Sequence, residues 1–247
     1  LDGLLDFQLP AFNQSKIAVV PQICTPYYTK SIIKNDGVVI STVTNPVSFA
    51  YKGGLALRDY KDYHDNFFTK YIGENCKFLT WQPTKKTVLI SSPEYLNFLV
   101  NFSPLPTVLK LRVKVFYTDL NDEVFTVKAL TGITAYTTYC FPVSPQALGL
   151  GDLTKTVKKY QVWVSNESEK RLSEVRTYEL DYKYYKSVRH ILFAGSLGNF
   201  DTLTCKGKAT TNMKVTKSVS QRYSGFDYLP NFSEKVISQV TGERELV

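Results

Sequence analysis

The stretch of sequence that decides the fold is Leu109-Lys110-Leu111-Arg112-Val113-Lys114-Val115-Phe116-Tyr117. Apolar residues occupy every second position and alternate with lysine, arginine and one phenylalanine. Because successive side chains of a β-strand point to opposite faces of a sheet, this alternation predicts a strand with one buried face. The residues Asp119-Leu120-Asn121-Asp122 predict a turn that leads into a second strand over residues 123–130.

Other parts of the chain carry the same β character between turn residues. The step Asp36-Gly37 separates the apolar runs 31–33 and 38–40, and it predicts a hairpin because both turn residues tolerate a positive φ angle. A weak helical period occurs in the polar and aromatic residues 60–74. Further strands are expected over residues 17–20, 47–51, 55–59, 77–81, 87–90, 133–141, 157–164 and 175–182.

Turn sequences recur at spacings of roughly 8 to 16 residues, which is typical of an antiparallel sandwich. We therefore predict an all-β fold of two tandem antiparallel β-sandwich domains, similar to immunoglobulin or fibronectin type III domains. The first is expected over residues 17–104 and the second over residues 105–223, with the boundary at Leu105-Pro106. An irregular N-terminal arm is expected over residues 1–16. The tail over residues 224–247 has an irregular or weakly helical pattern, and we expect the native chain to continue beyond it.

The composition excludes several classes of protein. The chain has 247 residues, a formal net charge of +8, and an unusual content of 17 Tyr and 15 Phe. The lysine-rich runs 155–159 and 206–217 lie along expected strands, so they predict a solvated strand face and no specific nucleic-acid binding. No apolar run approaches the length of about 18 residues that a membrane-spanning helix needs, so no membrane span is expected.

The cysteines lie far apart and form no CxxC pair, which argues against a zinc site. Buried free thiols are favoured, and a disulfide in an oxidising compartment stays open as an alternative. The four residues are Cys24, Cys76, Cys140 and Cys205.

Residues 184–208 combine an apolar strand, a turn that contains glycines, and a second strand. Ser196 lies between Gly195 and Gly198 and superficially resembles a nucleophile elbow, but the glycine spacing is wrong and both flanks have a β pattern. We therefore expect Gly195 and Gly198 to serve the backbone of a turn. His64 and His190 lack the spacing of a metal site. The sequence thus predicts no catalytic residue, no metal and no cofactor.

A set of tyrosines in and just after the strand expected over residues 175–182 is a candidate for contacts with other subunits. Tyrosine suits interfaces because its ring packs while its hydroxyl group stays hydrated. The alternatives are a sugar-stacking platform and simple filling of the core. The candidate interface residues are Tyr178, Tyr182, Tyr184 and Tyr185.

Two phrases of the sequence resemble proteins of Bacteroidetes phages and prophages. The first is Phe78-Leu79-Thr80-Trp81-Gln82-Pro83-Thr84-Lys85-Lys86-Thr87-Val88, followed by Ser92-Pro93-Glu94-Tyr95-Leu96-Asn97-Phe98-Leu99. The second is the aromatic strand and turn that contain Ser196-Leu197-Gly198-Asn199-Phe200-Asp201-Thr202-Leu203. Ala194-Gly195 stands where those proteins usually have Arg-Asn, and Trp81 stands where a small polar residue is common.

The resemblance implies a β-rich structural component of a tail or virion, with no catalytic residues to transfer. It covers about residues 30–225 in order and spacing. We therefore expect a non-enzymatic protein of the virion that forms a homo-oligomer and binds other virion or tail proteins. The alternative is a carbohydrate-binding or adhesin module of a gut bacterium, extracellular or on the cell surface, that binds a glycan through exposed aromatic residues. A glycoside hydrolase would need two carboxyl groups that face each other across a cleft.

Overall fold

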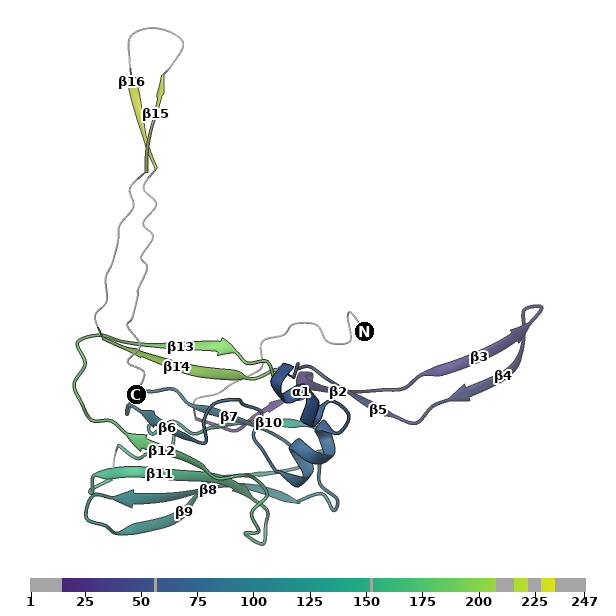
Figure 1. The fold of residues 1–247 in the computed structure, drawn as a ribbon, viewed down its shortest axis with the longest axis horizontal. Coiled ribbons are helices and arrows are strands. Elements are labelled where there is room, and N and C mark those ends of the chain that lie inside the picture. Colours follow the sequence, from purple (N-terminus) through teal and green to yellow (C-terminus); the bar gives the residue numbers. More distant parts are fainter. Residues whose placement is uncertain (1–14, 56, 152, 208–215, 222–227, 234–247) are drawn as a thin grey trace. The chain divides into compact units, whose positions relative to one another are not determined.

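The structure is a computed structural model that describes residues 15–55, 57–151, 153–207, 216–221 and 228–233 (Figure 1). Strands account for 47% of the chain and helices for 7%, which confirms the prediction of an all-β fold. The chain divides into two compact units. One contains the residues up to Tyr182 together with Leu192–Leu203, and the other contains Lys183–Ile191 and the residues from Thr204 onward.

The elements follow one another along the chain as in Figure 1. The strands before the α-helix are β1 (Ala18–Val20), β2 (Cys24–Tyr27), β3 (Lys30–Asn35), β4 (Val38–Thr44) and β5 (Ser48–Tyr51). The helices are the 3-10 turn η1 (Pro21–Ile23), the α-helix α1 (Leu57–Tyr63) and the π-helix η2 (Phe67–Glu74). The later strands are β6 (Lys85–Val88), β7 (Tyr95–Leu99), β8 (Val108–Tyr117), β9 (Asp122–Thr131), β10 (Thr138–Pro142), β11 (Val157–Ser165), β12 (Arg176–Leu180), β13 (Val188–Ala194), β14 (Phe200–Lys206), β15 (Thr216–Gln221) and β16 (Tyr228–Ser233).

Two sheets form the centre of the first unit. One has the strand order β6-β12-β11-β8-β9, and the other has the order β1-β10-β7. The pairs within them are antiparallel except that β12 and β6 run parallel. A single apolar cluster draws residues from both sheets, including Phe98 and Phe141 from the smaller sheet and Val113 and Val162 from the larger one. The two sheets therefore share one core, as in a β-sandwich.

The alternation predicted for residues 109–117 is confirmed in β8. The residues Leu109, Leu111, Val113 and Val115 are fully buried, whereas the residues between them are half-exposed. Because β8 lies between β11 and β9, its inward face supplies the middle of the core. This strand organises the sandwich.

The strand pairing crosses the boundary that the sequence suggests near residue 104. The strands β6 and β7 precede this point, yet they pair with β12 and β10, which follow it. Residues from both sides also fill one apolar cluster. The arrangement as two tandem immunoglobulin-like sandwiches is thus not confirmed. Long-range pairing of this kind leaves no local signal, because turn residues report only connections between neighbouring strands.

Two predicted strands are absent, and one observed strand was not predicted. Residues 55–59 were expected to form a strand but lead into the α-helix α1, and the helical period of residues 60–74 continues into η2. Residues 77–81 form no strand, because partners outside a ladder bind their backbone, such as the hydroxyl group of Tyr71, which lies 3.0 Å from the carbonyl oxygen of Phe78. The strand β7 was missed because all five of its residues are buried, which removes the alternation.

Four two-stranded sheets complete the described chain: β2–β5, β3–β4, β13–β14 and β15–β16. The Asp36-Gly37 turn joins β3 to β4 as predicted, with φ angles of 47° and 82°. In the expected irregular or weakly helical tail, β16 instead pairs with β15, which corrects that prediction for the residues of this strand. The rest of the tail and residues 1–14 of the expected N-terminal arm lie outside the described residues. Among the described residues, no helix has both the length and the apolar character that crossing a membrane requires.

A buried and an exposed position of neighbouring strands test the assignment of the core. We expect Leu111→Ala to lower the free energy of unfolding by about 3 kcal/mol, because it leaves a cavity in the fully buried core. Val124→Ala on β9 serves as the control, because its side chain is 45% exposed and its loss should cost less than about 0.5 kcal/mol. Urea unfolding followed by tryptophan fluorescence measures both, and equal losses would contradict the assignment.

Candidate functional site

The turn at residues 195–199 connects β13 to β14 and is the centre of a network of contacts. The amide of Gly195 donates to the carbonyl oxygen of Asn199 at 2.8 Å, and the amide of Gly198 donates to the carbonyl oxygen of Gly195 at 3.1 Å. The hydroxyl oxygen of Ser196 accepts the indole N–H of Trp81 at 2.6 Å. A strand on each side of the turn fits structural turn chemistry better than a nucleophile elbow.

Both glycines of this turn lie where a side chain has no room. Gly198 has a φ angle of +71°, and a Cβ atom there would overlap the carbonyl oxygen of Lys52. A Cβ atom on Gly195 would overlap the side-chain oxygen of Asn199. Gly198 thus allows both a left-handed backbone and a close approach to another segment, and Gly195 allows close packing within the turn.

The turn binds the segment that follows β5. The hydroxyl group of Tyr51 donates to the carbonyl oxygen of Leu197 at 2.5 Å, and the amide of Gly54 donates to the carbonyl oxygen of Ser196 at 2.6 Å. The side chain of Leu197 is buried in an apolar cluster with Cys24, Tyr71 and other residues. Because β5 pairs with β2, these contacts fix both strands at the base of the β3–β4 hairpin.

The turn and the start of β14 also bind residues 80–86. The hydroxyl group of Thr80 donates to the carboxylate of Asp201 at 2.6 Å, and the side-chain amide of Gln82 donates to the carbonyl oxygen of Thr202 at 3.0 Å. Asn199 donates a further hydrogen bond to Asp201 at 3.0 Å. The segments 78–88 and 196–203 are therefore direct partners in the folded chain.

A buried ion pair lies beside these contacts. The ammonium group of Lys86 lies 2.8 Å and 3.0 Å from the two carboxylate oxygens of Glu94. It also donates to the side chain of Gln82 and to the carbonyl oxygen of Thr202, each at 2.7 Å. The charge of Lys86 is thus distributed over three acceptor groups, which offsets the cost of removing it from water.

Burial also changes the acidity of both carboxyl groups. It raises the pKa of Glu94 to about 6, although the neighbouring Lys86 acts in the opposite direction. Burial likewise raises the pKa of Asp201, against the effect of its hydrogen bonds from Thr80 and Asn199. Both carboxyl groups are almost inaccessible to solvent. Carboxyl groups shielded from solvent in this way favour a structural role over glycoside hydrolysis, which needs carboxyl groups that reach the sugar.

The histidines and cysteines form no convergent site in the part of the chain that is described. His64 lies 2.8 Å from Asp65 on the surface, and Nδ1 of His190 lies 3.1 Å from the hydroxyl group of Thr204. No group of three His, Cys, Asp or Glu residues that could hold a metal ion occurs among the described residues. The four cysteines are free thiols, and burial raises the pKa of Cys140 to about 12.

The four candidate interface tyrosines have different environments. Tyr178 is buried and stacks on Tyr160 with ring centroids 5.1 Å apart. This residue therefore fills the core and is no longer an interface candidate. The cause is the alternation of β12, which turns Tyr178 inward. Tyr182 is exposed and donates to the carbonyl oxygen of Val157. Tyr184 is exposed, and Tyr185 lies under the ammonium group of Lys206.

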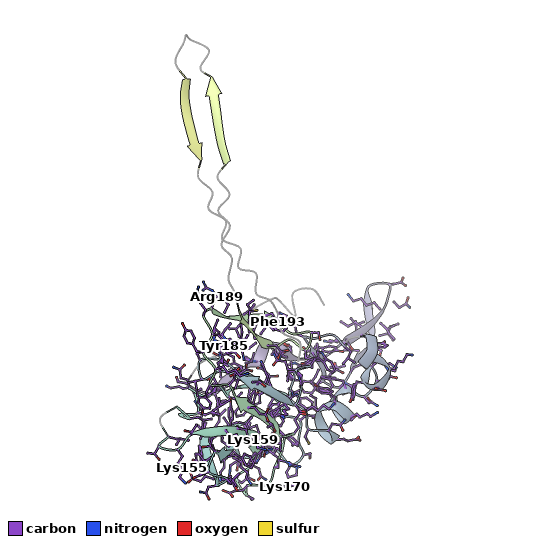
Figure 2. All side chains as sticks on the ribbon, turned by 60° about the vertical axis from the view of Figure 1, so that its left-hand side comes forward. Lys155, Lys159, Lys170, Tyr185, Arg189 and Phe193 are labelled. Atoms are coloured by element: carbon purple, nitrogen blue, oxygen red, sulfur yellow. The ribbon has the colours of Figure 1, made fainter. Side chains whose placement is uncertain are left out.

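The lysine-rich run 155–159 lies at the beginning of β11, where Figure 2 labels Lys155 and Lys159. Lys155 forms an ion pair with Asp119 at 3.1 Å, and Lys159 lies 4.6 Å from the ring centre of Phe116. These lysines thus have partners within the sheet surface.

The β3–β4 hairpin is the most exposed apolar feature of the described chain. Every residue of β3 and all but one of β4 are exposed, and no other described strand pairs with either (Figure 1). Six of its Ile and Val side chains are between 48% and 69% exposed. The hairpin was predicted from its turn, but this exposed apolar surface was not. Its signal is the unbroken apolar runs Ile32-Ile33 and Val38-Val39-Ile40, which place apolar side chains on both faces of the strands.

Comparison with family models and with curated proteins found no match.

Two glycines with similar backbone angles provide a matched test of the turn. We expect Gly198→Ala to lower the free energy of unfolding by about 3 kcal/mol, because left-handed strain adds to the overlap with Lys52. Gly37→Ala should cost only about 1 kcal/mol, because Gly37 has a φ angle of +82° but no atom within 4 Å of the added Cβ atom. Urea unfolding measures both, and a Gly198 variant no less stable than the Gly37 variant would show that the turn is loosely packed.

The buried ion pair predicts a dependence of stability on pH. Burial raises the pKa of Glu94 in the folded chain from its ordinary value of 4.5 to about 6. The stability that the protonated carboxyl group contributes is therefore fully present below pH 4.5 and is lost as the pH rises through about 6. The loss amounts to about 2 kcal/mol. Glu94→Gln should remove this slope between pH 4.5 and 6.5.

The control for this slope is Glu179→Gln, which removes a surface carboxyl group paired with Lys85. Urea unfolding at a series of pH values should give the Glu179 variant the slope of the unmodified chain. A Glu94 variant that retains the full slope would assign the pH dependence to other groups.

Proposed function

We propose that the chain is a non-enzymatic structural protein of a phage or prophage virion. It assembles with copies of itself and with neighbouring tail or virion proteins through its β surfaces. The observation that carries the proposal is the β3–β4 hairpin, whose two faces are both apolar and exposed. The resemblance of the two contacting phrases to phage proteins supports the virion as the location.

Energetics favour a partner for this hairpin. A two-stranded hairpin without further packing is marginally stable in water. Burial of one half-exposed Val or Ile side chain contributes about 1 kcal/mol, and six such side chains are available. The base of the hairpin is fixed by the turn at residues 195–199, so the hairpin loses little additional freedom when it binds.

The alternative, a carbohydrate-binding or adhesin module, has less support from the geometry. Trp81 donates its indole N–H to Ser196, and its ring centroid lies 5.6 Å from that of Tyr71. The ring is therefore engaged within the chain, which makes it a poor surface for stacking a sugar. An apolar cavity of about 180 Å³ is lined by Tyr51, Phe67, Phe68 and other residues. Its walls contain few polar groups for sugar hydroxyls. The exposed Tyr182 and Tyr184 remain the candidates for glycan contacts.

Removal of the hairpin tests the proposal. The ends of the hairpin meet where the amide of Asn45 donates to the carbonyl oxygen of Thr29 at 2.9 Å, so an Asn-Gly turn can replace residues 30–44. We expect the unmodified chain to form oligomers and the shortened chain to be monomeric with unchanged urea unfolding. Gel filtration with light scattering measures both.

A strict monomer of the unmodified chain at high concentration would refute self-assembly. A shortened chain that keeps the size of the unmodified oligomer would show that another surface carries it. For the virion, we expect terminase, portal or tail genes next to the coding gene, and a neighbourhood of carbohydrate-utilisation genes would favour the adhesin alternative.

A further inference from the structure

The apolar cavity of about 180 Å³ lies where three segments of the first unit meet. Tyr51 at the end of β5 and the residues that follow it supply one part of its wall. Phe67 and Phe68 of η2, together with Leu197 of the turn at residues 195–199, supply the rest. None of the residues that line the cavity carries a charge. The cavity therefore adjoins the contacts that fix the base of the β3–β4 hairpin.

Three aromatic rings form one corner of this wall. The ring centroids of Tyr51 and Phe67 are 5.0 Å apart with an interplanar angle of 37°. Phe68 meets both of these rings nearly edge-on, at 6.2 Å and 87° from Tyr51 and at 5.7 Å and 79° from Phe67. Separations of this size are those of rings in contact, so the three rings offer a ligand one continuous hydrocarbon surface.

Donor groups of the lining residues are already used within the chain. The hydroxyl group of Tyr51 donates to the carbonyl oxygen of Leu197 at 2.5 Å. The amide of Gly53 donates to the carbonyl oxygen of Tyr51 at 3.2 Å, and the amide of Gly54 donates to that of Ser196 at 2.6 Å. A polar ligand would lose its hydrogen bonds to water and find none of these donors free, which is unfavourable.

The volume and the walls of the cavity together define the class of ligand. A dry cavity of about 150 Å³ lined by Leu, Ile and Phe is large enough to bind benzene. A cation would leave water for an uncharged wall in a chain of net charge +8, which disfavours it. We propose that this cavity is a binding site for a small uncharged hydrocarbon ring, of which benzene is the simplest member. The site goes beyond the assembly role, because no residue of the β3–β4 hairpin lines it.

A ligand in this cavity would contact the segment after β5, η2 and the turn at the same time. Because it binds only where these segments meet, it stabilises the folded chain over the unfolded chain. We therefore expect benzene to raise the urea concentration at the midpoint of unfolding and to leave the slope of the transition unchanged.

Binding of benzene to the full chain tests the proposal directly. We expect saturable 1:1 binding by isothermal titration calorimetry. We also expect intermolecular nuclear Overhauser effects between the benzene protons and the methyl groups of Leu55 and Leu197, which both line the cavity. Tetramethylammonium chloride supplies a small organic cation that aromatic rings can bind, and it should bind at least tenfold more weakly than benzene.

Two glycines provide a matched pair of variants. An added Cβ atom meets no atom within 4 Å at either Gly54 or Gly151, and neither residue has a left-handed backbone, but only Gly54 lines the cavity. We expect Gly54→Leu to weaken benzene binding at least tenfold, because the new side chain takes up space in the cavity. Gly151→Leu should bind benzene like the unmodified chain. Urea unfolding without ligand checks that both variants fold.

Four results would overturn the proposal. The first is the absence of benzene binding, and the second is nuclear Overhauser effects to residues outside the cavity alone. The third is tetramethylammonium binding as tight as that of benzene, which would assign the site to organic cations. The fourth is a folded Gly54 variant that binds benzene as tightly as the Gly151 variant, which would place the ligand elsewhere. If the Gly54 variant does not fold, the Overhauser contacts of the unmodified chain decide alone.

Discussion

The close approach of the turn at residues 195–199 to Lys52 is the constraint on which the rest of the structure depends. At Gly198 the backbone is left-handed and touches another segment, so a side chain would separate the two. The side chain of Leu197 in the same turn packs in an apolar cluster, and the carbonyl oxygens of the turn accept hydrogen bonds from Tyr51 and Gly54. A turn between two strands thus positions the base of a hairpin that lies far away in the sequence.

The buried polar groups make this arrangement specific. Thr80 and Asn199 both donate to Asp201, and Lys86 binds Glu94 and the backbone of β14. Each buried charge is costly unless its partners are in place, so the loop before β6 and the start of β14 are stable only together. The β3–β4 hairpin has no such network on its faces. The chain thereby combines a firmly anchored base with an apolar surface that has no partner within the described chain.

Local pattern was sufficient for some elements and insufficient for others. The strand β8 and the Asp36-Gly37 hairpin could be predicted because their signals lie within ten consecutive residues. The parallel pairing of β6 with β12 could not, because it depends on contacts about ninety residues apart. The glycines of the turn were recognised from their residue type. Their partner Lys52 was not, because nothing in a single sequence marks the segment that a turn approaches.

Electron cryomicroscopy of the assembled chain tests directly whether the hairpin is the assembly element. We predict density in which the β3–β4 hairpins lie buried between neighbouring copies. Hairpins that project freely into solvent, in particles whose copies are joined through other strands, would contradict this assignment.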